Sequence, residues 1–166
     1  ITSDVAPVNR CPEVENMAAL KLGEHPHVLE HIGAYTDPAR PQYTYVVSPF
    51  CGKGSLDNVV SAALDNRKFL TTTVIGRAFI QCCLGVRHLH SKGTVHGDLK
   101  PENVFIHNFD NGRAVVADIA GKGESTTCDK APEQFQNRPE TWTEKCDVWG
   151  LGVILHYICT NGKQFF

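Results

Sequence analysis

Two segments of the chain carry apolar residues at the three- and four-residue steps of a helix. The first spans residues 71–91 and is followed by Gly93, so it predicts a long helix with one buried face. The second spans residues 13–22, ahead of Gly23, and predicts a shorter helix. A continuous apolar run at residues 148–159 predicts a third, buried helix that starts near Asp147.

Three shorter segments are rich in β-branched and aromatic residues and predict strands. They lie at residues 43–50, 104–106 and 114–117, and the turn Asp110-Asn111-Gly112 between the last two favours a hairpin. Residues 51–54 contain two glycines and end the first strand, and Ser55 is a good N-cap for a helix that follows it. Helices and strands therefore share a chain of 166 residues, the size of one domain.

The composition is that of an ordinary globular protein and excludes several classes. Hydrophobic residues make up 42% and charged residues 20%, and the net charge of −2 comes without any long run of like charges. We therefore expect no nucleic acid partner. The longest apolar run contains two glycines and a histidine and is too short to span a bilayer, so we expect no membrane insertion. Seven cysteines without a C-x-x-C pair fit neither a disulfide framework nor a zinc site, which favours a reducing, intracellular and cytoplasmic location.

The candidate chemistry lies in the segment His96-Gly97-Asp98-Leu99-Lys100-Pro101-Glu102-Asn103. Asp98 can orient an attacking hydroxyl, and Lys100 can neutralise the charge of a phosphoryl group during transfer. Asn103, five residues after the acid, can ligate a metal ion that bridges the phosphates of a nucleotide. An acid, a lysine and an amide at these intervals indicate phosphoryl transfer.

Three further motifs follow along the chain: Asp118 after a predicted strand, then Ala131-Pro132-Glu133, then Asp147-Val148-Trp149-Gly150-Leu151-Gly152. Together the four motifs resemble those of the protein kinase family, and the resemblance covers the chain from about Glu13. It implies one partial kinase domain with an α+β fold. Residues 1–50 would be the remnant of a small β-rich N-lobe, with helix C and two strands, and the entry to the hinge. Residues 51–166 would be the first part of a mainly helical C-lobe, through the helix that starts near Asp147.

The resemblance implies roles for four residues and two cofactors. Asp98, Lys100, Asn103 and Asp118 are the implied catalytic residues, and the last two would ligate Mg²⁺ bound to ATP. A lysine two residues after the acid is the serine/threonine pattern, so the implied reaction is ATP-dependent phosphoryl transfer to Ser or Thr hydroxyls of a protein substrate. Asp147 resembles the buried family acid that holds the backbone of the catalytic loop.

The hinge region is implied to bind the nucleotide base. The carbonyl of Pro49 and the N–H of Cys51 stand where the family contacts adenine, and Pro49 loses only an N–H that the family does not use. Phe105 would pack beneath the ring, and Ser55 completes the implied nucleotide-binding set.

The chain departs from the family pattern at several points. Gly97 stands where the family has an arginine that receives the phosphate of the activation loop, and the segment from Asp118 to Glu133 is short. We therefore expect that activation-loop phosphorylation does not switch this protein. The family's strand lysine and Gly-rich phosphate loop would lie before Ile1, so the isolated chain is expected to be inactive.

Two other function classes stay open. The chain can belong to a pseudokinase or kinase-like binding module, since Ala120 replaces a family glycine and the activation segment is short. Small-molecule phosphotransferases also share a His-Gly-Asp string with an asparagine five residues on, but the downstream motifs resemble protein kinases. Retention of Asp98, Lys100, Asn103 and Asp118 favours an active protein kinase, because a binding module needs none of that chemistry.

Overall fold

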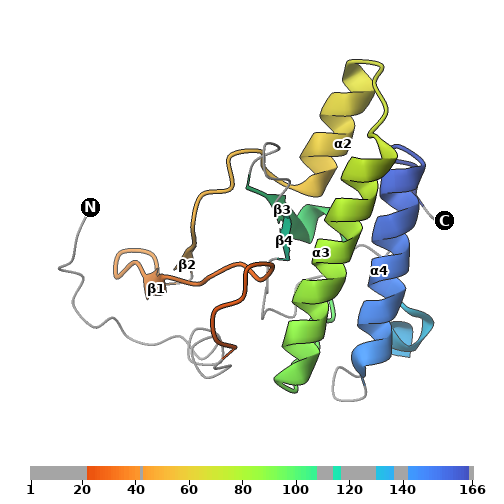
Figure 1. Ribbon diagram of the computed structural model, residues 1–166. Helices are drawn as coiled ribbons and strands as arrows, with labels where there is room; N and C mark the ends of the chain where they lie inside the picture. The colour runs from red at the N-terminus through yellow and green to blue at the C-terminus, as the bar shows by residue number, and fades with distance from the viewer. Residues whose placement is uncertain (1–21, 42, 108–113, 117–129, 137–141, 165–166) are drawn as a thin grey trace.

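The computed structural model describes residues 22–41, 43–107, 114–116, 130–136 and 142–164. The elements in chain order are β1 (Gly33–Thr36), β2 (Thr44–Val47), α2 (Leu56–Asp65), α3 (Thr72–Ser91), the 3-10 turn η1 (Pro101–Asn103), β3 (Val104–Ile106), β4 (Ala114–Val116), the 3-10 helix η3 (Pro132–Gln136) and α4 (Glu144–Cys159) (Figure 1). Helices α3 and α4 run side by side, and the β1–β2 hairpin extends away from the helical part (Figure 1). The predicted mixture of helices and strands is confirmed. Residues 13–21 of the helix predicted at 13–22 lie outside the described residues, as do the turn 110–112, Ala117 and Asp118.

Both described sheets are two-stranded antiparallel hairpins. In the first, β1 pairs with β2 so that Gly33 lies opposite Val47, and the rings of Tyr35 and Tyr45 stack with centroids 5.0 Å apart. Strand β2 stops at Val47, short of the predicted end at Phe50, and Pro49 has no N–H with which to extend a ladder. In the second hairpin β3 pairs with β4.

Side-chain caps define where α2 and α3 begin. Ser55 accepts a hydrogen bond from the N–H of Asn58, and the Asn58 side chain accepts one from the N–H of Ser55, so the two form a capping box. Thr71 caps α3 in the same sense by accepting from the N–H of Val74. The predicted cap at Ser55 and the predicted long helix are both confirmed.

The last helix begins one turn earlier than its apolar pattern predicts. Thr143 is the N-cap and α4 starts at Glu144, whereas the sequence places its start near Asp147. Glu144 and Lys145 are polar and exposed, so the helix starts ahead of the apolar run that predicts it. Further along, α4 packs so closely on the loop before η1 that a Cβ on Gly150 would lie 2.6 Å from Cβ of Leu99.

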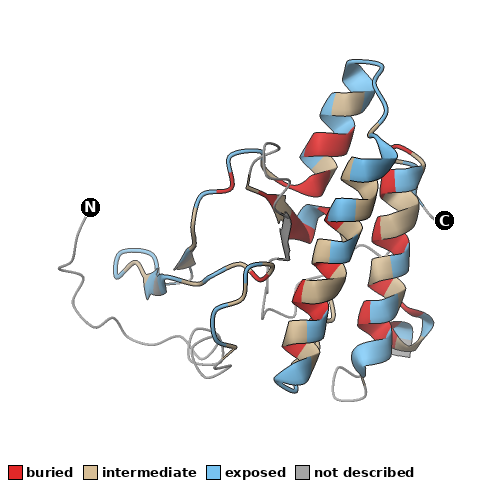
Figure 2. Ribbon diagram, viewed as in Figure 1, coloured by how far each residue is buried: buried red, intermediate tan, exposed pale blue. Residues whose placement is uncertain are grey.

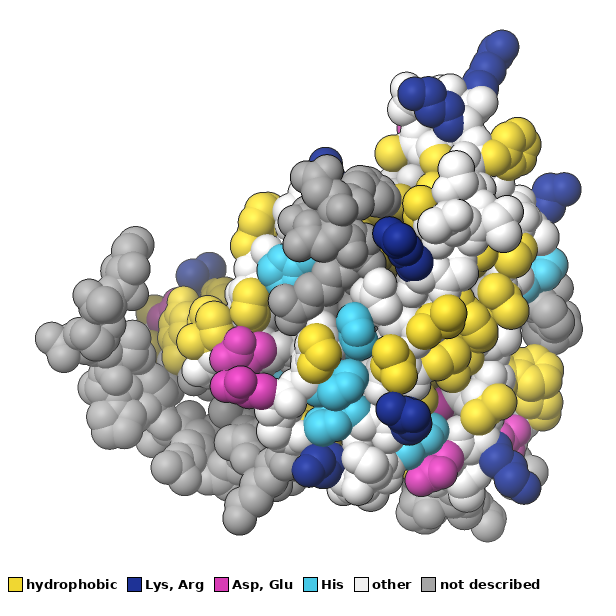
Figure 3. Space-filling model, in the orientation of Figure 1, with side chains coloured by type: hydrophobic (Ala, Val, Ile, Leu, Met, Phe, Trp, Pro, Cys, Tyr) yellow, Lys and Arg dark blue, Asp and Glu magenta, His cyan; other side chains and the backbone are white. Residues whose placement is uncertain are grey.

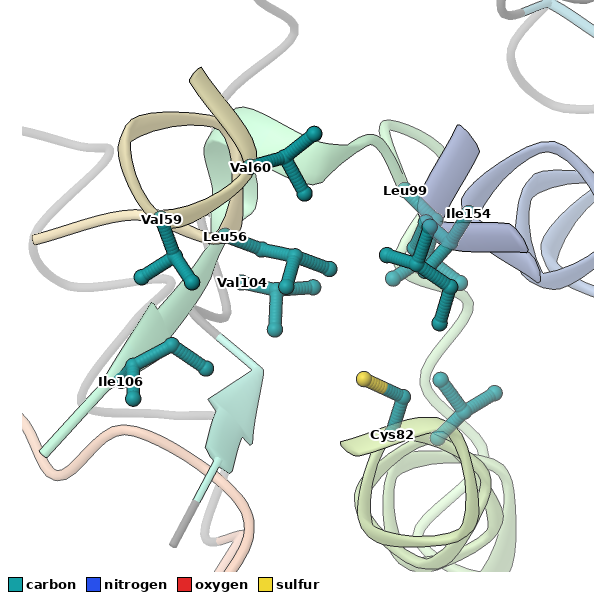
Figure 4. Packing of buried hydrophobic residues seen from close by; sticks show 10 residues of the cluster. Leu56, Val59, Val60, Cys82, Leu99, Val104, Ile106 and Ile154 are labelled. Atoms are coloured by element: carbon teal, nitrogen blue, oxygen red, sulfur yellow. The ribbon is translucent and has the colours of Figure 1, made fainter. Parts of the chain in front are cut away.

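Buried residues concentrate where the helices and the β3 strand face one another (Figure 2). A single cluster joins α2, α3, β3 and α4 (Figure 4). Its members are Leu56, Val59, Val60, Cys82, Val86, Leu99, Val104, Ile106, Ile154 and Ile158. Burial raises the pKa of Cys82 to about 12, so its thiol serves as a small apolar side chain. Within the described part of the chain, no helix is long and apolar enough to cross a membrane.

Histidines tie the segment before β1 to helix α3. The ring of His25 stacks on that of His88 with centroids 4.5 Å apart, and Nε2 of His88 lies 2.6 Å from the carbonyl oxygen of Leu22. Histidine side chains gather on the face of the molecule that Figure 3 presents. No group of three or more His, Cys, Asp or Glu among the described residues is arranged to hold a metal ion.

Candidate active site

The backbone of the loop between α3 and η1 is held by a buried carboxylate on α4. Asp147 is 1% exposed; its Oδ2 accepts from the N–H of His96 at 2.9 Å and its Oδ1 from the N–H of Gly97 at 2.8 Å. Nε2 of His90, at the end of α3, lies 2.7 Å from the same Oδ2. The prediction that Asp147 holds the backbone of this loop is confirmed, and its burial is compensated by three hydrogen-bonding partners.

The structure brings three of the four predicted catalytic residues together. Nδ2 of Asn103 donates to the backbone oxygen of Asp98 at 2.7 Å and to Oδ2 of Asp98 at 2.9 Å. Nζ of Lys100 lies 3.3 Å from the same Oδ2, and both members of this ion pair are largely buried. One carboxylate oxygen of Asp98 is therefore anchored by an amide and an ammonium group.

The other carboxylate oxygen of Asp98 has no hydrogen-bond partner in the described part of the chain. Oδ1 is buried and forms no hydrogen bond with any residue that the structure describes. An unsatisfied buried acceptor costs about 1–3 kcal/mol, and an acceptor of a negatively charged group costs more. A hydroxyl group that donates a hydrogen bond to Oδ1 would therefore remove this free-energy cost.

The amide oxygen of Asn103 is of the right chemical type to ligate magnesium. Its amide nitrogen is used on Asp98, so the oxygen of the same amide is the atom left for other contacts. Magnesium binds oxygen and takes only one or two ligands from the protein, with phosphates and water as the rest. Asp118, the second predicted ligand, lies outside the described residues.

Backbone pairing places the predicted hinge next to β3. The N–H of Lys53 donates to the carbonyl of Ile106 at 3.2 Å, and the N–H of Ile106 donates to the carbonyl of Gly54 at 2.9 Å. Ser55 forms an antiparallel bridge with Phe105. The hinge exit and the half-buried Phe105 therefore lie side by side.

Three hinge residues differ in how their groups are used. Cys51 is buried, with its thiol 3.8 Å from the carbonyl oxygen of Pro49. Phe50, between them, is 87% exposed. The hydroxyl of Ser55 lies 3.0 Å from Oδ1 of Asn58 and accepts from the N–H of the same residue, so Ser55 serves to position α2.

Sequence reasoning missed one residue that contacts the loop. Gln134 in η3 is 4% exposed; its Nε2 donates to the carbonyl of Gly97 at 2.7 Å, and its Oε1 accepts from the N–H of Ala131 at 2.8 Å. A buried glutamine has no periodic or spacing signature of its own. Its position directly after Ala131-Pro132-Glu133 is the sole signal in the sequence.

Gly97 has a conformation and an environment that favour glycine. Its φ is +75°, in the left-handed region, and a Cβ there would lie 3.0 Å from Cε3 and Cζ3 of Trp142. The indole of Trp142 therefore lies against the position that a side chain at residue 97 would occupy.

Comparison with known proteins gives the family of the chain. The protein kinase domain model matches residues 7–166, so the chain belongs to the protein kinase family. It is 30% identical to the serine/threonine-protein kinase Nek3 of Mus musculus over 74% of this chain and 25% of the relative. It is 27% identical to the MAP kinase kinase MKK1/SSP32 of Saccharomyces cerevisiae, over 82% of this chain and 28% of the relative. It is 26% identical to Nek2 of Mus musculus over 92% of this chain and 37% of that relative. The chain therefore spans only about a quarter to a third of the length of these curated relatives.

Proposed function

We propose that the full-length protein carrying this chain transfers the γ-phosphoryl group of ATP to serine or threonine hydroxyls of a protein substrate. The observation that carries the proposal is the state of the Asp98 carboxylate. Its Oδ2 is anchored by Asn103 and Lys100, while Oδ1 is buried and unpartnered among the described residues. A carboxylate held in this way is oriented to accept a hydrogen bond from an incoming hydroxyl.

The neighbouring residues supply the other requirements of this reaction. Lys100 would move from Asp98 toward the phosphoryl group and balance the negative charge that spreads over its oxygens. Asn103, together with Asp118, would hold magnesium, which neutralises the phosphates when bound. The carbonyl of Pro49, the N–H of Cys51 and the ring of Phe105 would hold the adenine base beside the hinge.

A kinase-like binding module is the alternative function. One experiment distinguishes it from a kinase, because the two predict different results. Full-length protein is incubated with ATP and Mg²⁺ and with mixtures of peptides that carry serine, threonine or tyrosine as the sole acceptor, beside choline and an aminoglycoside. We expect phosphate on the serine and threonine peptides only. Transfer to the small molecules alone would favour their class of phosphotransferase, and nucleotide binding without any transfer would favour the binding module.

A further inference from the structure

We propose that Gln134 is a positioning residue for phosphoryl transfer: it holds the peptide group between Gly97 and Asp98, and so orients the Asp98 carboxylate without help from a phosphate. The proposal rests on the proposed function for its effect on turnover. Its structural part stands on the contacts of the described residues alone.

Three successive peptide groups ahead of the carboxylate are each bound by a side chain. The N–H groups of His96 and Gly97 donate to Asp147 at 2.9 and 2.8 Å. The next N–H, that of Asp98, donates to Nδ1 of His96 at 3.1 Å. The carbonyl of Gly97 belongs to this last peptide group and accepts from Gln134 at 2.7 Å. The peptide that carries Asp98 is therefore held at its nitrogen by His96 and at its oxygen by Gln134.

The two contacts of Gln134 fix which way its amide points. Only the amide oxygen can accept from the N–H of Ala131, and only the amide nitrogen can donate to the carbonyl of Gly97. Gln134 is 4% exposed, so its amide is largely shielded from water and depends on these two contacts. A single orientation of the side chain thus satisfies both partners.

The hydrogen bond from Gln134 acts at Gly97, the most flexible residue type in the loop. Glycine enters many backbone conformations that other residues avoid, so a loop with glycine next to the catalytic acid is held in place chiefly by its contacts. Trp142 covers the Cα of Gly97, and Gln134 binds its carbonyl. Rotation of the Gly97–Asp98 peptide would break the bond to Gln134 and move the Asp98 carboxylate.

Gln134 also connects two parts of the site that are separate in sequence. It lies in η3, beside the N-terminal half of α4 (Figure 1), and follows the Ala131-Pro132-Glu133 motif. Both hydrogen bonds of Gln134 join uncharged groups. They therefore need neither a phosphorylated residue nor an arginine that would bind its phosphate. The loop order that the family pattern obtains through an arginine at position 97 is obtained here through an amide.

The test compares Gln134→Glu with Gln164→Glu, the same change at an exposed position, in the full-length protein. Glutamate keeps an oxygen for the N–H of Ala131 but places a second oxygen against the carbonyl of Gly97. We expect kcat to fall on the order of 10- to 100-fold with KM for ATP changed less than about twofold, because small misplacements of a reacting group cost this much. Gln164→Glu should leave both unchanged.

Two readouts separate positioning from general destabilisation. In Gln134→Glu the introduced carboxyl group can again donate to Gly97 once it is protonated, so the ratio of variant to wild-type kcat should rise as the pH is lowered from about 8 to about 6. Amide hydrogen exchange of Gly97 and Asp98 should be faster in Gln134→Glu than in wild type, and unchanged in Gln164→Glu. If Gln134→Glu fails to fold, Gln134→Met replaces it and should show the loss of kcat without the pH dependence.

Wild-type kcat and wild-type exchange in Gln134→Glu would overturn the proposal. So would a loss of kcat that is the same at every pH and is accompanied by no change in exchange at Gly97 and Asp98. A wild-type protein without turnover would instead contradict the proposed function, and the exchange measurement would still decide whether Gln134 holds the peptide.

Discussion

Replacing Gly97 by alanine is expected to lower the free energy of unfolding by about 2–5 kcal/mol. The backbone contributes about 1–2 kcal/mol of this, because a φ of +75° is unfavourable for a residue with a Cβ. Packing contributes about 1–3 kcal/mol, because the new Cβ would lie 3.0 Å from two ring carbons of Trp142. Either the loop backbone or the indole ring would then have to move. Both contributions act on the loop that carries Asp98.

The assay is urea denaturation of the full-length protein, arranged as a double-mutant cycle with Trp142→Ala. Without the indole, the packing part of the cost disappears and the backbone part stays, so Gly97→Ala should then cost about 1–2 kcal/mol. Gly76→Ala on α3 is the matched control, since a Cβ there would meet no atom of the described residues within 4 Å and its helical position favours alanine by about 0.5–1 kcal/mol.

Two results would refute this reasoning. If Gly97→Ala is as stable as Gly76→Ala, the left-handed conformation and the close contact with Trp142 are both wrong. If Gly97→Ala costs the same with and without Trp142, the indole does not occupy the space of the missing side chain.

Two further predictions concern α4 and the histidines. Asp147→Asn should cost about 3 kcal/mol in urea denaturation, because the neutral amide can accept from only one of the N–H groups of His96 and Gly97 and turns an NH2 group, which cannot accept, toward the other; a cost as small as that of the exposed control Asp65→Asn would contradict it. Burial, then His88, His27 and Arg87, lower the pKa of His25 below its usual 6.5, so the folded state takes up a proton less readily than the unfolded state, and stability is lost as the pH falls below about 6.5. His25→Phe keeps a ring against His88 but cannot titrate, so its urea midpoint should fall less than that of the wild type between about pH 7 and pH 5. An identical fall in both proteins would contradict the role of His25.

Elements with a strong local signal could be predicted from the sequence. The N-cap at Ser55 and the long helix of residues 72–91 depend on neighbours in the chain, so residue type and periodicity were enough to predict them. The start of α4 could not be predicted in this way, because its first two residues, Glu144 and Lys145, are polar and exposed and lie ahead of the apolar run. Strand β1 is short and its Tyr35 is exposed, so no alternating pattern marked its bounds.

In the candidate site, too, contacts between residues close in sequence could be predicted, and contacts that depend on the folded chain could not. The spacing of Asp98, Lys100 and Asn103 within one loop anticipates that their side chains meet, because the chain between them is too short to separate them. Gln134 lies 37 residues from Gly97, and its contact exists only after the chain has folded. The burial of Oδ1 of Asp98 without a partner among the described residues is likewise a property of the assembled site that no sequence pattern contains.

The role of Asp98 is decided by comparing Asp98→Asn with the wild type in the transfer of phosphate from ATP to a serine or threonine peptide. The introduced amide keeps the size of the side chain and loses the carboxylate that would accept the hydroxyl proton. We therefore predict transfer slower by about 10²- to 10⁴-fold with unchanged affinity for ATP and Mg²⁺. Equal rates of transfer by the two proteins would contradict the assignment of Asp98 and, with it, the kinase mechanism proposed for this loop.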